Sequence, residues 1–203
     1  MTDIPTRQGR LPWPRPDELT DPQRRLYEIL RGGPRTTDGG TYSIVDEEGR
    51  LEGPFNIMLS SPALGVPLQA LGRAVRFESA LTDRQREMAI LRVAAWTRSE
   101  FEWYVHERLG RRAGLSNDEL AAIQHGDDVP SLDDDERIVH RLTEQLLATG
   151  DLDDLSFADG VEALGMVSVL DLALLVAYYH LLAFTMRVFR TPLPKAELPI
   201  RWR

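Results

Sequence analysis

Apolar residues recur at helical spacing along most of the chain after residue 54, and polar residues or glycines separate the runs. At the start of three runs, Ser or Thr stands three residues before Glu or Gln, which is typical of a capping box. The three boxes are Thr82 with Gln85, Ser99 with Glu102 and Ser116 with Glu119. The pattern predicts helices at about 61–79, 83–97, 100–114, 117–126, 133–149, 157–164 and 169–189.

The first quarter of the chain lacks this helical spacing of apolar residues, because proline and glycine interrupt it. Prolines at 12, 14 and 16 favour an extended arm over residues 1–20, and Asp21-Pro22 begins a short helix that stops before Gly32. The β-prone residues 41–53 predict a short β-hairpin or an ordered loop, and 54–60 predict a helical turn. We therefore expect an all-α protein with an N-terminal arm (1–20), one domain (21–190) and a Pro-rich tail (191–203).

The amino-acid composition excludes several classes of function. The chain has 203 residues and a net charge of −8, which does not resemble a nucleic-acid-binding surface. It has no cysteine, which excludes disulfides, thiolate metal sites, Fe–S ligation and cysteine redox cycles. The only lysine, Lys195, lies in the Pro-rich tail, a poor position for a Schiff-base amine.

One stretch, Met166 to Met186, is apolar enough to be mistaken for a membrane span. Asp171 and His180 interrupt it, and no basic cluster precedes it, so we expect a wholly buried helix, at a subunit interface for example. Residues 1–20 lack the apolar run of a signal peptide. These features predict a cytoplasmic protein with no membrane partner.

Glu87 is the first candidate for chemistry, because it lies on the apolar stripe of the helix predicted at 83–97. A carboxylate on a core-facing stripe is rarely buried without a partner. A structural ion pair with Arg84 or Arg92 satisfies this requirement, and so does a catalytic or ligand-orienting role.

Glu102 and His106 are four residues apart and share one helix face at the edge of the apolar stripe. A carboxylate beside an imidazole can hold one tautomer and produce a general acid or base. Alternatively, Glu102 closes the capping box with Ser99, and His106 is a half-buried structural histidine. A metal site on Glu102 and His106, with Glu87 or His180, is a weaker hypothesis because no ligand motif such as H-E-x-x-H is present. His180 has apolar neighbours in the sequence, and we expect it to be buried and neutral.

The run LTDRQREMAILRVAAWTRSEFEWYVHERLGRRAGLSNDELAAI resembles the carboxymuconolactone decarboxylase family, which is related to the AhpD-like alkylhydroperoxidases. The family has an R-x-x-E-x-x-x-L-R helix, a Y/F-E-W-x-x-H helix and a G-L-S/T turn. Those elements stand here as Arg84–Glu87–Leu91-Arg92, Phe101-Glu102-Trp103 with His106, and Gly114-Leu115-Ser116. The similarity covers most of residues 15–195 and implies the AhpD-like helical bundle.

The resemblance also implies what the chain does. In the redox branch of the family, two cysteines stand between the glutamate and the histidine, and here those positions hold Ser99 and Glu102. The chain therefore resembles a cysteine-less branch, and we expect no thiol-peroxidase activity. The resemblance implies a lyase, isomerase or cyclase that uses no cofactor and no metal, and that decarboxylates, isomerises or cyclises a small carboxylate, lactone or carbonyl substrate.

The resemblance and the spacing together assign roles to the candidate residues. His106 moves a proton, Glu102 orients it, and Glu87 orients His106 or binds a substrate hydroxyl. Developing negative charge needs a donor, for which Arg92 is the candidate. The expected lining residues are Trp96, Trp103, Tyr179 and His180. Family relatives form rings, so we expect a homo-oligomer, a trimer or hexamer ahead of a dimer; the alternative function is a non-catalytic small-molecule-binding or oligomeric interaction protein.

Overall fold

The computed structural model describes residues 9–33, 42–194 and 202. Over these residues the protein is all-α, as predicted, and its strand content is one isolated antiparallel bridge between Val45 and Leu51. The elements are η1 (Pro16–Glu18), α1 (Asp21–Arg31), α2 (Pro54–Ser60), α3 (Pro62–Phe77), α4 (Asp83–Thr97), α5 (Glu100–Arg112), α6 (Asn117–His125), α7 (Asp134–Thr149), α8 (Asp154–Leu164) and α9 (Met166–Phe189). The first eight residues of the predicted arm, Thr41 of the predicted hairpin and most of the tail lie outside the described residues.

The chain forms two compact units, one of residues 1–73 and 184–199 and the other of residues 74–183 and 200–203. Each is described here by itself. The candidate site lies in the second unit, so the first unit needs only a short account.

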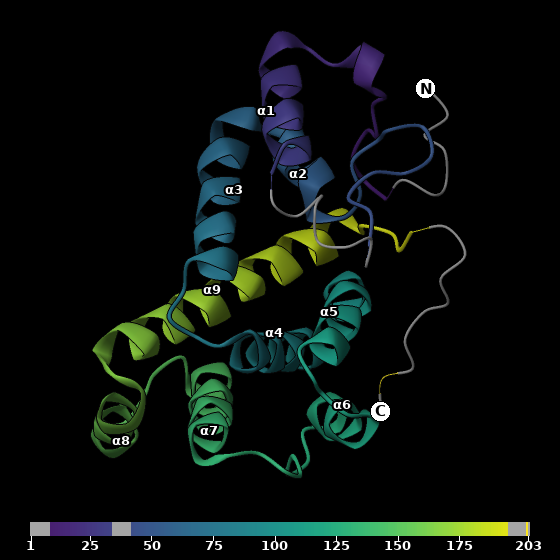
Figure 1. Cartoon of the computed structure of the whole chain (residues 1–203). Helices are drawn as coiled ribbons and strands as arrows, with labels where there is room; N and C mark the ends of the chain where they lie inside the picture. The colour runs from purple at the N-terminus through teal and green to yellow at the C-terminus, as the bar shows by residue number, and fades with distance from the viewer. Residues whose placement is uncertain (1–8, 34–41, 195–201, 203) are drawn as a thin grey trace. The chain divides into compact units, whose positions relative to one another are not determined.

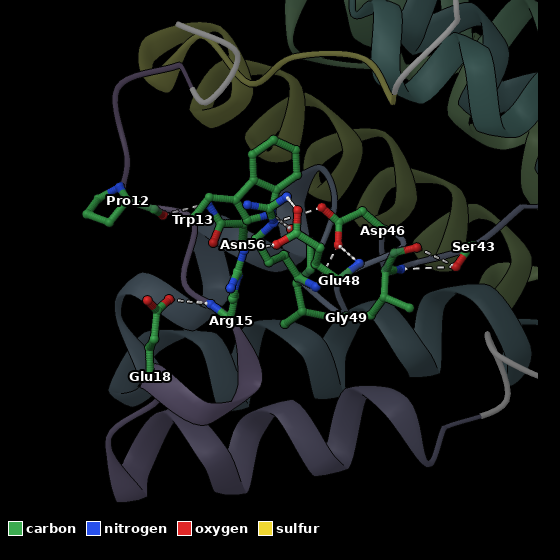
Figure 2. Close-up of polar contacts among 12 residues, drawn as sticks. Pro12, Trp13, Arg15, Glu18, Ser43, Asp46, Glu48, Gly49 and Asn56 are labelled. Carbon is green, nitrogen blue, oxygen red and sulfur yellow. Dashed lines mark hydrogen bonds and ion pairs between the residues drawn. The ribbon is translucent and has the colours of Figure 1, made fainter. Parts of the chain in front are cut away.

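In the first unit, side-chain hydrogen bonds hold the arm against α2 and against the loop near residue 46 (Figure 2). The Trp13 indole N–H donates to the Leu51 carbonyl at 2.6 Å, and the Asn56 amide donates to the Pro12 carbonyl at 3.1 Å. The predicted hairpin is therefore an ordered loop with a single bridge. The arm is not extended throughout, because Pro16 begins a short 3-10 turn.

The second unit is built around α4, which packs against α5, α6 and α7, while α8 packs on α7 (Figure 1). Most residues of α4 are buried, including Met88, Ile90, Leu91 and Val93, each at most 1% exposed. A helix that is covered on nearly every side places its polar residues in the core as well. This is why Glu87, although charged in isolation, lies inside the protein.

The side chain of Arg84 links α4 to α6, to α7 and to the turn at Gly114. Its guanidinium donates to Glu136 of α7 at 2.6 Å, to Glu119 of α6 at 2.5 Å and to the Gly114 carbonyl at 2.7 Å. Burial raises the pKa of Glu119, but the bonds from Arg84 and from Ser116 outweigh it and hold that pKa below its usual value. Arg84 is therefore a structural residue, and the predicted Arg84–Glu87 ion pair is wrong.

One face of α9 is buried and the opposite face is exposed. Leu172, Leu175 and Tyr179 belong to the buried face, whereas Leu170, Leu174 and Leu181 belong to the exposed one. The expectation of a wholly buried helix is therefore wrong for the single chain, since only one face has protein against it. By length and composition alone, α9 is the one helix of the described residues that could cross a membrane.

Candidate functional site

The structure joins Glu87 of α4 to His106 of α5. The His106 Nδ1 atom lies 2.6 Å from the Glu87 Oε2 atom, and the two side chains are about 6% and 4% exposed. They are nineteen positions apart in the sequence. Glu87 is thus the carboxylate that orients the imidazole, and we call the two residues the Glu87–His106 pair.

Close packing of α4 on α5 makes this contact. One turn beyond Glu87 is Leu91, and one turn beyond His106 is Gly110, so the next layer of the interface is Leu91 against Gly110. A Cβ atom at Gly110 would lie 3.0 Å from the Leu91 Cδ1 atom and 2.9 Å from the Leu115 Cδ1 atom. The glycine therefore lets the helices approach closely enough for the Glu87–His106 bond.

Burial lowers the pKa of His106, because a charged imidazolium loses its hydration in the core. The Glu87 carboxylate opposes this shift, while the positive charges of Arg76 and Arg86 add to it. His106 is therefore a neutral imidazole at pH 7. In that state the Nδ1–H group donates to Glu87, and Nε2 is the nitrogen that can accept a proton.

Three further residues surround the pair. Tyr179 of α9 stands at 90° to the His106 ring with 5.1 Å between ring centroids. Arg86 Nε lies 3.9 Å from the second oxygen of Glu87, and its guanidinium also donates to Asp83 at 2.7 Å. The sequence did not indicate Arg76 or Arg86, because no spacing rule connects an arginine on α3 or α4 with a histidine on α5.

Glu102 does not have either of the partners expected from the sequence. Its side chain is buried, and neither carboxyl oxygen has a hydrogen-bond partner among the described residues. The predicted bond to His106 is wrong, and so is the capping box, since Ser99 makes no side-chain cap bond. Neighbours four apart share a helix face, but the imidazole of His106 bonds across to α4 instead.

Burial raises the pKa of Glu102 to about 8. The Ser99 hydroxyl lies nearby and lowers this pKa in part, without the geometry of a hydrogen bond. Glu102 is therefore a neutral carboxylic acid at pH 7, one helical turn before His106 on the same face of α5.

The other predicted site residues have different surroundings. Arg92 forms an ion pair with Glu144 of α7 and lies 5.5 Å above the half-exposed Trp96 ring, so it is already paired rather than available to a substrate anion. Trp103 is buried edge-on against Trp202, with 5.7 Å between ring centroids. His180 is exposed, because it follows Tyr179 by 100° around α9 and points away from the core. The expectation of a buried His180 is wrong.

A metal centre finds no support in the described part of the chain, where no group of three or more His, Asp or Glu side chains is placed to hold an ion. The Glu87–His106 pair and Glu102 are the groups of the site with which an acid–base reaction can be built. Together they offer a neutral base and a neutral acid in the buried interior of the second unit.

An all-α bundle with a buried Glu–His pair between adjacent helices is the class that the fold and the site define. A solved structure described as an alkylhydroperoxidase AhpD core, an uncharacterised peroxidase-related protein from Ralstonia eutropha JMP134, has the same fold. It aligns over 92% of this chain and 93% of its own with a TM-score of 0.71 and 14% identity. None of the curated proteins compared with the chain matches it.

Residues 62–143 match the carboxymuconolactone decarboxylase family. The match contains Glu87, Glu102 and His106 and the helices that carry them. Over these residues the chain is similar to that family, and it has no cysteine.

Proposed function

We propose that the protein is a cofactor-independent acid–base enzyme of the carboxymuconolactone decarboxylase type. His106 Nε2 takes a proton from carbon or oxygen next to a carbonyl, lactone or carboxylate group, and the electron pair left behind passes into that group. In decarboxylation the same residues act in the other direction. The bond from the substrate carbon to the carboxylate breaks, CO₂ leaves, and the electron pair of that bond stays on the substrate carbon. An acid then protonates this carbon. The observation that carries the proposal is the 2.6 Å bond between His106 and Glu87, which fixes a neutral imidazole in one tautomer.

Glu102 supplies the acid in this proposal. A neutral carboxyl can donate a hydrogen bond, or its proton, to the oxygen on which negative charge develops. An ionised carboxylate in the same place would repel that charge. The burial that keeps Glu102 protonated is therefore part of the chemistry.

A thiol-peroxidase reaction, suggested by the description of the Ralstonia protein, needs a redox-active thiol. This chain has none, and the position of one family cysteine holds Glu102 instead. We therefore infer that proton transfer has replaced thiol chemistry on this scaffold. We also propose that the enzyme is cytoplasmic.

Burial of the site favours a second candidate, a non-catalytic small-molecule-binding or interaction protein. Both His106 and Glu87 are buried in the single chain. A pair this well covered would also serve to hold α4 on α5.

The experiment measures hydrogen–deuterium exchange at carbon, because exchange reports proton abstraction before the natural substrate is known. The probes are 4-oxopentanoate, acetoacetate and a γ-lactone carboxylate in D₂O, followed by NMR, with CO₂ release measured for acetoacetate. Wild-type protein should accelerate exchange of at least one probe. His106→Gln should lose about 10²–10⁴-fold of the acceleration with its fold intact.

His125→Gln is the matched control, since His125 lies on α6 in a contact with Asp127 at 4.0 Å and not in the site. It should exchange the probes at the wild-type rate. Binding of a probe by wild-type protein without any exchange would instead favour the binding-protein candidate, and equal rates in wild type and His106→Gln would remove His106 from the chemistry.

A further inference from the structure

The first unit has a pocket that the acid–base site does not use. It encloses about 250 Å³ of space, part of it open to solvent, between the arm, the start of α2 and the end of α9. We call it the arm pocket. No charged side chain lines it, and its lining residues are Leu11, Trp13, Gly53, Asn56, Phe189, Thr191 and Pro192. All of them belong to the first unit, so the arm pocket is separate from the Glu87–His106 pair.

Hydrogen bonds fix the walls of the arm pocket. The Arg10 backbone N–H donates to the Phe189 carbonyl at 2.8 Å, and the Arg10 guanidinium donates to the Val188 carbonyl at 3.0 Å. A Cβ atom at Gly9 would lie 2.3 Å from the Arg190 carbonyl oxygen, so only glycine lets the arm approach the end of α9 this closely. The pocket is therefore built in advance of any ligand, which lowers the entropic cost of binding one.

Asn56 gives the arm pocket a buried acceptor that has no donor. The residue is 8% exposed, and its amide nitrogen donates to the Pro12 carbonyl at 3.1 Å, which also holds the arm to α2 (Figure 2). Its Oδ1 atom is buried and has no hydrogen-bond partner among the described residues. Because the Pro12 carbonyl can only accept, the amide cannot be turned round to exchange its nitrogen and oxygen. A buried oxygen without a donor is unfavourable, and a ligand in the pocket can supply that donor.

The surroundings of the arm pocket favour a neutral ligand. A charged group would leave water without finding an opposite charge in the lining. The ring of Trp13 could attract a cation, but the Arg50 guanidinium already lies 5.7 Å from the centroid of that ring and repels a second positive charge. The indole N–H of Trp13 cannot donate to a ligand, because it is bonded to the Leu51 carbonyl. The ligand itself must therefore bring the donor for Asn56.

We propose that the arm pocket binds a small neutral alcohol. The hydroxyl of the alcohol donates to the Asn56 Oδ1 atom, and its apolar part packs against Trp13 and Phe189. A hydroxyl can also accept a hydrogen bond, which suits the hydroxyl of Thr191, the other polar side chain of the lining. Pockets for drug-sized ligands measure roughly 300–1,000 Å³, so we expect a compact molecule here.

The test compares cyclopentanol with cyclopentanone, which have the same ring, although only the alcohol carries a donor. Titration is followed by ¹H–¹⁵N NMR of the Trp13 indole N–H, which Trp13→Phe identifies among the four tryptophans. Cyclopentanol should shift this signal with a Kd on the order of 1 mM, as is reasonable for a ligand of about six non-hydrogen atoms. Cyclopentanone should bind at least about 10-fold more weakly, because it leaves Asn56 without a donor.

Two substitutions of leucine by tryptophan locate the binding. Leu11→Trp fills the arm pocket and leaves its polar groups in place, so it should weaken cyclopentanol binding at least about 10-fold, with an unchanged circular dichroism spectrum. Leu64→Trp is the matched control, since Leu64 is 70% exposed on α3 in the same unit and does not line the pocket. It should bind cyclopentanol as wild-type protein does.

Three results would overturn the proposal. Equal affinities for cyclopentanol and cyclopentanone would mean that Asn56 does not select the ligand. An unchanged Trp13 signal up to about 50 mM cyclopentanol would mean that a water molecule alone supplies the donor. Tighter binding of cyclopentylammonium than of cyclopentanol would make the pocket a cation site. None of these results bears on the acid–base site, which belongs to the other unit.

Discussion

At the scale of single residues, burial gives Glu102 and His106 opposite effects on stability. The folded protein keeps a proton on Glu102 up to about pH 8, whereas the unfolded chain loses it near pH 4.5. The free energy of unfolding therefore falls as pH rises between these values. His106 acts in the other sense, because its folded pKa is lowered and stability is lost as pH falls below 6.5.

Glu102→Gln tests the Glu102 half of this account. A neutral amide has no proton to lose, so the variant should gain on wild type by about 1.4 kcal/mol per pH unit from pH 4.5 upward. At pH 8 it should be the more stable protein by several kcal/mol, and the difference should shrink as pH falls. Urea unfolding at pH 5, 6.5 and 8 measures it.

Glu162→Gln, on the exposed side of α8, is the control and should leave the pH dependence of wild type unchanged. If Glu102→Gln were less stable than wild type at pH 8, with the pH slope intact, the carboxyl would be ionised in the folded protein. The proposed acid would then be lost.

The sequence predicted these residues better than it predicted their partners. The repeat of apolar positions placed Glu87 in the core, the four-residue spacing selected Glu102 and His106, and the family resemblance supported all three. The rule for residues four apart paired Glu102 with His106, because it considers one helix only. The actual partner comes from α4, a contact that depends on how two helices pack, and Arg76 and Arg86 went unnoticed for the same reason.

At the scale of elements, helix-capping and helix-breaking residues were the sequence signals that best predicted where helices begin and end. The boxes at Thr82 and Ser116 form as predicted, and α4 and α6 begin directly after them. The prediction for α8 began three residues late, because Asp153 is the true cap and accepts a bond from the Ser156 amide. The sequence did not indicate Arg84 as a structural centre, since its acceptors lie 30 to 52 residues away.

Arg84→Met tests the role of that residue in holding α4, α6 and α7 together. It leaves the carboxylates of Glu119 and Glu136, 4% and 9% exposed, without their cation. We expect a loss of about 3 kcal/mol in the free energy of unfolding, measured by urea titration.

Arg141→Met is the comparison, because the pair of Arg141 with Asp159 is roughly half exposed. It should cost less than about 1 kcal/mol. Equal losses in the two variants would mean that the buried network contributes no more than a surface pair.

At the scale of the whole molecule, the helical spacing of apolar residues predicted the all-α class, and the low polarity of α9 predicted a covered helix. The sequence could not say which face of α9 the chain itself covers, since both faces are apolar. Burial in the structure separates them: Tyr179 faces His106, whereas Leu170, Leu174 and Leu181 are exposed.

The most direct test of the account is ¹⁵N NMR of the imidazole nitrogens at pH 7. The chain has four histidines, and His106→Gln identifies the signals of His106. We predict a neutral ring with the proton on Nδ1, and in Glu87→Gln a shift of the population toward the Nε2-protonated tautomer. A doubly protonated ring, or a wild-type ring with its proton on Nε2, would contradict the claim that Glu87 holds His106 as a base.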